Sequence, residues 1–145
     1  MKKLLCILLG ILSAFTISKY FIGQDSIPTI SLEEANTAYI FQIGVYNDRA
    51  KAEKLSKNNK GIIIEKDNKY YVYVGILKNK NNINKLKTIL EKKKIKYYQK
   101  EEQVNNIFYN KLEELEILME NTKTEVAFNK INETILNYYK ENYED

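Results

Sequence analysis

The 145-residue sequence has no histidine and no tryptophan, and it has one cysteine and one proline. A single cysteine cannot build a disulfide framework within the chain. Without histidine, zinc sites and serine-histidine-aspartate triads lose their usual ligand and general base. These absences remove most enzyme chemistry, so the sequence predicts a protein that is not an enzyme and that holds no metal and no cofactor.

Acidic residues are scarce in the middle of the chain and concentrated at its end. Residues 39–101 have 16 basic and 6 acidic side chains, a net charge of +10, whereas residues 102–145 have 4 basic and 10 acidic side chains, a net charge of −6. A cationic middle segment suggests a polyanionic partner, namely nucleic acid, anionic lipid or a cell-wall polymer. The alternative is that the lysines only solvate helix faces.

The N-terminus has the pattern of a membrane segment. Lys2 and Lys3 precede an apolar run from Leu4 to Ile22 that is interrupted by Lys19, which can snorkel to the interface. About twenty such residues span a hydrocarbon core. A cleaved signal peptide has a similar start, but no small-residue cleavage pattern follows, so we expect an uncleaved anchor. The two lysines should stay in the cytoplasm, which places the rest of a single-pass protein of the cell membrane on the extracytoplasmic side.

Two stretches that each run into a glycine organise the middle of the chain. Residues 39–46 read Tyr-Ile-Phe-Gln-Ile-Gly-Val-Tyr and residues 70–77 read Tyr-Tyr-Val-Tyr-Val-Gly-Ile-Leu. A constant shift of 31 positions (75 − 44) pairs Gly44 with Gly75 and Leu55 with Leu86. The chain therefore contains two copies of a strand-helix unit, which fits one compact domain better than a longer repeat array.

The order of elements predicts an α+β fold. Strands are expected at 39–46, 61–66, 70–77 and 95–100, with a tight hairpin between the second and third. One helix is expected after a cap at Asn47 or Asp48, and another over 78–94. This βαββαβ order is that of a ferredoxin-like sandwich, in which two helices cover one face of a four-stranded antiparallel sheet.

Strict alternation assigns the side chains of the glycine-bearing strands to two faces. In the first strand it places Phe41, Ile43 and Val45 in the core and Gln42, Gly44 and Tyr46 on the opposite face. In the third strand it separates Tyr70, Val72 and Val74 from Tyr71, Tyr73 and Gly75. The second face would then be open to solvent.

The runs Phe41–Tyr46, Arg49–Leu55 and Tyr71–Leu77 together resemble the SPOR (sporulation-related repeat) domain over about residues 39–101. SPOR domains are peptidoglycan-binding modules of bacterial envelope proteins, commonly on a membrane anchor, that recognise glycan strands stripped of stem peptides at division and sporulation septa. The resemblance implies that the open sheet face binds the sugar chain. It implies glycan-binding roles for Gln42, Tyr46, Tyr71 and Tyr73 and structural roles for Gly44 and Gly75.

A sugar ring offers hydrogens to an aromatic face and hydroxyls to an amide, so tyrosines beside a glutamine make a plausible carbohydrate platform. Without the resemblance, Tyr71 and Tyr73 would be ordinary cross-strand neighbours. A basic βαββαβ domain with sheet aromatics is also the plan of the RRM, an RNA-binding module, but the signature Lys/Arg-Gly-Phe/Tyr run is missing and the leading span argues for export. Nucleic acid is therefore not the expected partner.

Residues 102–145 predict two amphipathic helices that form an antiparallel hairpin, with a break near 121–123. These helices could pack on the preceding domain or on each other, or they could bind an envelope or divisome protein. An alternative function is therefore that of an interaction scaffold in the cell envelope. The expected organisation is an anchor over 1–23, a linker over 24–38, a SPOR-like domain over 39–101 and an acidic helical extension over 102–145. Because both repeat copies lie within 39–101, we expect that segment to fold alone.

Overall fold

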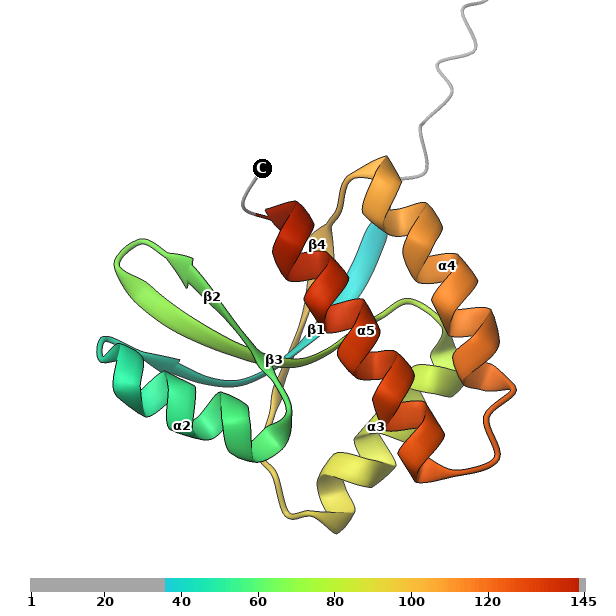
Figure 1. The fold of residues 1–145 in the computed structure, drawn as a ribbon, viewed down its shortest axis with the longest axis horizontal. Coiled ribbons are helices and arrows are strands. Elements are labelled where there is room, and N and C mark those ends of the chain that lie inside the picture. Colours follow the sequence, from blue (N-terminus) through green and yellow to red (C-terminus); the bar gives the residue numbers. More distant parts are fainter. Residues whose placement is uncertain (1–35, 144–145) are drawn as a thin grey trace, which may run out of the picture. The chain divides into compact units, whose positions relative to one another are not determined.

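The computed structural model describes residues 36–143, in which eight elements follow one another as β-α-β-β-α-β-α-α (Figure 1). The strands are β1 (Thr37–Tyr46), β2 (Ile62–Lys66), β3 (Lys69–Leu77) and β4 (Tyr98–Gln103), and the helices are α2 (Arg49–Asn59), α3 (Lys80–Lys92), α4 (Asn106–Glu120) and α5 (Glu125–Tyr143). The anchor expected over 1–23 lies outside the described residues. Over 36–143 no helix is long and apolar enough to span a membrane.

The four strands form one antiparallel sheet in the order β2-β3-β1-β4. This arrangement confirms the expected α+β class and the expected hairpin between the second and third strands. The hairpin turn consists of Asp67 and Asn68, whose φ angles are 52° and 57°. Positive φ at both central residues is the signature of a type I′ turn, whose twist matches that of the flanking strands, and Asp and Asn tolerate it better than other side chains.

Short polar side chains start the helices. Asp48 accepts a hydrogen bond from the backbone N–H of Ala50 at 2.9 Å, so of the two expected residues, Asn47 and Asp48, it is Asp48 that caps α2. Asn79 caps α3 and Asn105 caps α4 in the same way. Because these caps satisfy N–H groups that have no partner within the helix, each helix begins at a defined residue.

Each repeat copy packs its own glycine against its own leucine. A Cβ added to Gly44 would lie 3.0 Å from Cδ2 of Leu55 on α2, and one added to Gly75 would lie 2.2 Å from Cδ2 of Leu86 on α3. These are the residues that the 31-residue shift pairs in the sequence. The structure confirms the internal repeat and shows its physical purpose, which is close approach of each helix to the sheet.

The strict alternation expected for the two glycine-bearing strands is wrong, because the β1–β3 register shifts between Phe41 and Gln42 and again between Gln42 and Gly44. Phe41 pairs with Gly75 and Gly44 pairs with Val72, so these four residues share the face that carries α2 and α3. Val45, expected in the core, is 41% exposed. A β-bulge adds one residue to a strand and moves the following side chains to the other face, which alternation cannot show.

Helices cover both faces of the sheet. Ile40 and Phe41 are neighbours in β1 and therefore point to opposite faces, yet both are fully buried, and the same holds for Ile76 and Leu77 in β3. Helices α2 and α3 cover one face, and α5 crosses the other, next to α4 (Figure 1). Their buried side chains belong to one apolar cluster, so the C-terminal helices share the core of a single compact unit.

Candidate functional site

Helix α5 lies over part of the sheet face that the sequence assigned to ligand binding. Tyr73, expected to be exposed on this face, is only 3% exposed, so the prediction of an open side chain is wrong for this residue. Its β2 neighbour Ile62, which lies directly opposite, is also buried. An isolated βαββαβ unit would leave this face open; the added hairpin closes it around Tyr73.

A polar network joins the covered part of the sheet to α5. The ammonium of Lys100 donates to the hydroxyl of Tyr73 at 2.9 Å and pairs with Oε2 of Glu102 at 2.6 Å. The hydroxyl of Tyr139 on α5 donates to Oε1 of the same carboxylate at 3.3 Å. The polar ends of Tyr73, Lys100, Glu102 and Tyr139 are thus paired with one another, which limits the cost of burying them.

Burial and hydrogen bonding in this network raise the pKa values of its two tyrosines and its lysine. Burial raises the pKa of Tyr73, and the pKa of Tyr139 rises further because of burial and the nearby carboxylate of Glu102. Burial alone would lower the pKa of Lys100, but its hydrogen bonds to Glu102 and Tyr73 outweigh this and raise it. The network therefore contains two neutral phenols and one ion pair, which is an arrangement suited to holding α5 rather than to proton transfer.

The remaining part of the same face stays accessible, and we call its residues Gln42, Val45, Tyr71 and Tyr98 the open corner. Gln42 on β1 lies directly opposite Tyr98 on β4 and Tyr73 on β3, while Val45 lies opposite Tyr71. Tyr98 is 64% exposed, and Gln42 and Tyr71 are half-buried. Opposite residues on antiparallel strands have Cβ atoms about 4.5–5.5 Å apart, so an amide stands beside an exposed phenol ring.

The predicted residues are thus only partly brought together. Gln42 and Tyr71 lie on the open corner, and the ring of Tyr71 is 6.4 Å from the ring of the buried Tyr73. Tyr46 lies on the opposite face, where its ring approaches Gly44 beside α2. Sequence reasoning missed Tyr98, although alternation within the last strand puts it on the face of Lys100; the register of that strand against β1 was needed to place it beside Gln42.

Charge and capping bonds fasten the acidic helices to the basic part of the chain. Ion pairs join Lys60 to Glu133 at 2.8 Å and Lys93 to Glu125 at 3.4 Å. Buried Glu116 on α4 accepts hydrogen bonds from the backbone N–H groups of Lys78 and Asn79, at 3.0 Å each, where α3 begins. A carboxylate at a helix N-terminus is favourable because it meets unpaired N–H groups and the positive end of the helix dipole.

The open corner consists of uncharged side chains. Within residues 36–143 no group of three or more acidic, cysteine or histidine side chains is placed to hold a metal ion. The corner offers an aromatic face, an amide that can donate and accept, and apolar carbon atoms from Val45. Such a surface can stack on a flat, hydroxylated ligand and hydrogen-bond to it.

Comparison with known proteins gives one solved domain with a similar structure. No protein-family model matches the chain, and no curated protein matches it. Among solved structures, the chain is similar to the solution structure of the peptidoglycan binding domain of the B. subtilis cell wall lytic enzyme CwlC, with 25% sequence identity and a TM-score of 0.42. The similarity covers 46% of this chain and 91% of that domain.

Proposed function

We propose that this protein binds the glycan strands of peptidoglycan without cleaving them, and that the open corner is its contact surface. The observation that carries the proposal is the cross-strand placement of Gln42 beside the exposed ring of Tyr98, with Tyr71 on the same face. The resemblance of residues 39–101 to the SPOR domain, and the bare sugar strands that such domains recognise, support glycan as the ligand.

The proposal also covers the location of the protein in the cell envelope. The apolar run over residues 4–22 acts as a membrane anchor, and the described unit lies on the outer side, where it meets the wall. Binding to strands without stem peptides enriches the protein at division or sporulation septa. A fluorescent fusion followed through growth and sporulation tests this part, and uniform membrane fluorescence throughout would contradict it.

Cosedimentation with purified sacculi tests the binding itself. Sacculi treated with an amidase expose bare strands and should bind the full chain more strongly than untreated sacculi. Single changes Gln42→Ala and Tyr98→Ala should each weaken binding several-fold, because a net hydrogen bond contributes about 1 kcal/mol and an aromatic contact about 0.5–1.5 kcal/mol. The triple change that also includes Tyr71→Ala should abolish it.

Two controls separate a lost contact from a lost fold. Tyr98→Phe keeps the ring and should retain most of the binding, since the stacking face is unchanged. Ile117→Ala removes a side chain of α4 that is 57% exposed and should leave binding unchanged. If the unmodified chain binds neither form of sacculus, the proposed function is wrong. If the triple variant binds as strongly as the parent, the open corner is not the binding site.

A further inference from the structure

An open hollow of about 280 Å³ lies between the end of β1 and helix α2, on the face of the sheet opposite the open corner. It is lined by Tyr46 on β1 and by Lys51, Lys54, Leu55 and Asn58 on α2. Tyr46 is a residue that the sequence predicts to bind glycan and that lies outside the open corner. The hollow shares no residue with the open corner, so it would be a second, separate binding site.

The ring of Tyr46 forms one wall of this hollow because Gly44 leaves room for it. A Cβ at position 44 would lie 2.7 Å from Cε2 of Tyr46 and 3.0 Å from Cδ2 of Leu55. The ring therefore lies against the strand beside α2, and its side chain is half-buried. An aromatic ring held in this way presents a face to the hollow on which the carbon-bound hydrogens of a sugar can rest.

Two lysines of α2 lie side by side at the hollow. Lys51 and Lys54 are three residues apart, and residues with this spacing are neighbours on one face of a helix. Both side chains are exposed, and within residues 36–143 neither of them forms an ion pair. Like charges at such spacing repel each other, so an anion placed between the two ammonium groups relieves an unfavourable contact.

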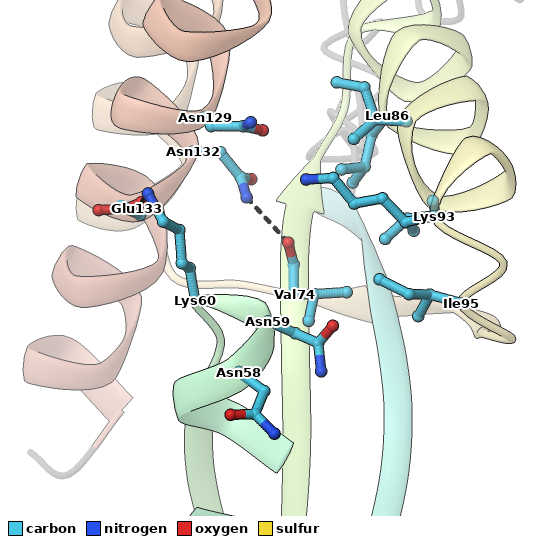
Figure 2. A pocket seen from close by; sticks show the side chains of 12 residues that line it. Asn58, Asn59, Lys60, Val74, Leu86, Lys93, Ile95, Asn129, Asn132 and Glu133 are labelled. Atoms are coloured by element: carbon cyan, nitrogen blue, oxygen red, sulfur yellow. Dashed lines mark hydrogen bonds and ion pairs between the residues drawn. The ribbon is translucent and has the colours of Figure 1, made fainter. Parts of the chain in front are cut away.

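Lysines elsewhere in the basic segment are already paired with the acidic helices. Nζ of Lys60, at the end of α2, lies 2.8 Å from Oε1 of Glu133 on α5 (Figure 2), and Lys93 pairs with Glu125 at 3.4 Å. The hollow differs, because α2 and the acidic helix α4 lie at opposite ends of the unit (Figure 1). Among the described residues that line the hollow none is acidic, so its positive charge is not compensated.

The lining favours an anionic group carried on a sugar. Two unpaired ammonium groups attract a carboxylate or a phosphate, the ring of Tyr46 suits the face of a sugar, and the amide of Asn58 can bond to hydroxyl groups. A bare peptidoglycan strand combines these features. Hydrolysis of the amide bond to each stem peptide leaves a free lactyl carboxylate on alternate sugars of the strand.

We infer that this hollow binds the N-acetylmuramic acid residues of bare glycan strands. The lactyl carboxylate pairs with Lys51 and Lys54, and the sugar ring stacks on Tyr46. While a stem peptide is attached, the same carboxyl group is an uncharged amide and does not attract the two lysines. The inference rests on the proposed function, because it names the chemical feature by which the protein distinguishes bare strands from intact ones.

Nitrogen-15 NMR of the full chain with N-acetylmuramic acid tests this site. We expect saturable shifts of the backbone signals of Gly44, Tyr46 and Lys51, with a millimolar dissociation constant, because exposed ion pairs are weak. N-acetylglucosamine, the same sugar without the lactyl group, should leave these three signals unchanged. Equal shifts with both sugars, or none with N-acetylmuramic acid, overturn the inference. Shifts with glycerol phosphate alone also overturn it, because the hollow would then bind phosphate.

Two double variants make the test specific. Lys51→Gln with Lys54→Gln removes both charges from exposed side chains and should raise the dissociation constant about tenfold. Lys57→Gln with Lys130→Gln is the matched control, since it removes the same charge from exposed side chains that do not line the hollow, and binding should be unchanged. If the two double variants bind N-acetylmuramic acid equally, the inference is wrong.

The two proposals fail separately. The double change at Lys51 and Lys54 should reduce the preference for amidase-treated over untreated sacculi. The triple change at the open corner should leave the N-acetylmuramic acid shift of Lys51 in place. Sacculus binding without any shift at the hollow refutes the muramic acid site alone. Shifts at the hollow without sacculus binding refute the wall-binding function, while the hollow still binds the free sugar acid.

Discussion

Replacing Leu112 by alanine tests whether the C-terminal hairpin is part of the core. Leu112 is fully buried on α4, in the cluster that also contains sheet residues. A buried Leu→Ala change removes transfer free energy and leaves a cavity, which together cost about 2–5 kcal/mol. Small domains have a total stability of only about 5–15 kcal/mol, so the loss should be large.

Leu118 provides a matched control on the same helix. It is 59% exposed, and the change Leu118→Ala has the same chemistry and the same helix propensity cost. Surface changes of this kind stay within about 0.5 kcal/mol. In urea denaturation the midpoint of Leu112→Ala should fall by about 1–3 M, given a slope of about 1–3 kcal/mol per M, while that of Leu118→Ala stays near the parent.

Equal denaturation midpoints for Leu112→Ala and Leu118→Ala would refute the idea that the hairpin shares the core. If both midpoints lie within about 0.3 M of the parent, the hairpin contributes no shared core, and the α4 contacts are peripheral. A chain that ends at Gln103 extends the test. The sequence predicts that residues 39–101 fold alone, but loss of the hairpin uncovers Ile40, Ile76 and Tyr73, so we now expect that chain to lack a cooperative melt.

Three further changes test single contacts. Glu116→Ala should destabilise the protein by roughly 2–4 kcal/mol, because two half-buried N–H groups lose a buried acceptor. Burial raises the pKa of Glu116, so this loss should be largest below the ordinary pKa of 4.5 and should shrink as pH rises through the raised pKa. Denaturation of both proteins at several pH values measures it. Gly75→Ala should cost about 1–3 kcal/mol by overpacking, and adding Leu86→Ala should cost less than the sum of the single changes; strict additivity would rule out the contact. Tyr139→Phe should cost about 1 kcal/mol, the bond to Glu102, and an unchanged midpoint would mean that this bond adds nothing to stability.

Much of the fold is legible in the sequence because it depends on local chemistry. The two glycine-bearing stretches, the Asp67-Asn68 turn and the Asp48 cap act over a few residues, and each leaves a recognisable pattern. The repeat goes further, since the 31-residue shift pairs the two leucines that later prove to oppose the two glycines. Element order, the antiparallel sheet and the two C-terminal helices follow from such signals.

What the sequence could not determine depends on contacts between distant segments. The bulges near Gln42 and Val74 shift the register by one residue, and period-two reasoning then assigns Val45 and Gly75 to the wrong faces. The sequence of an amphipathic helix shows that one side is buried, but it does not show which surface that side packs against. The burial of Tyr73 under α5 is therefore seen only in the tertiary structure. The same is true of the meeting of Gln42 with Tyr98, because cross-strand neighbours are set by register rather than by either strand alone.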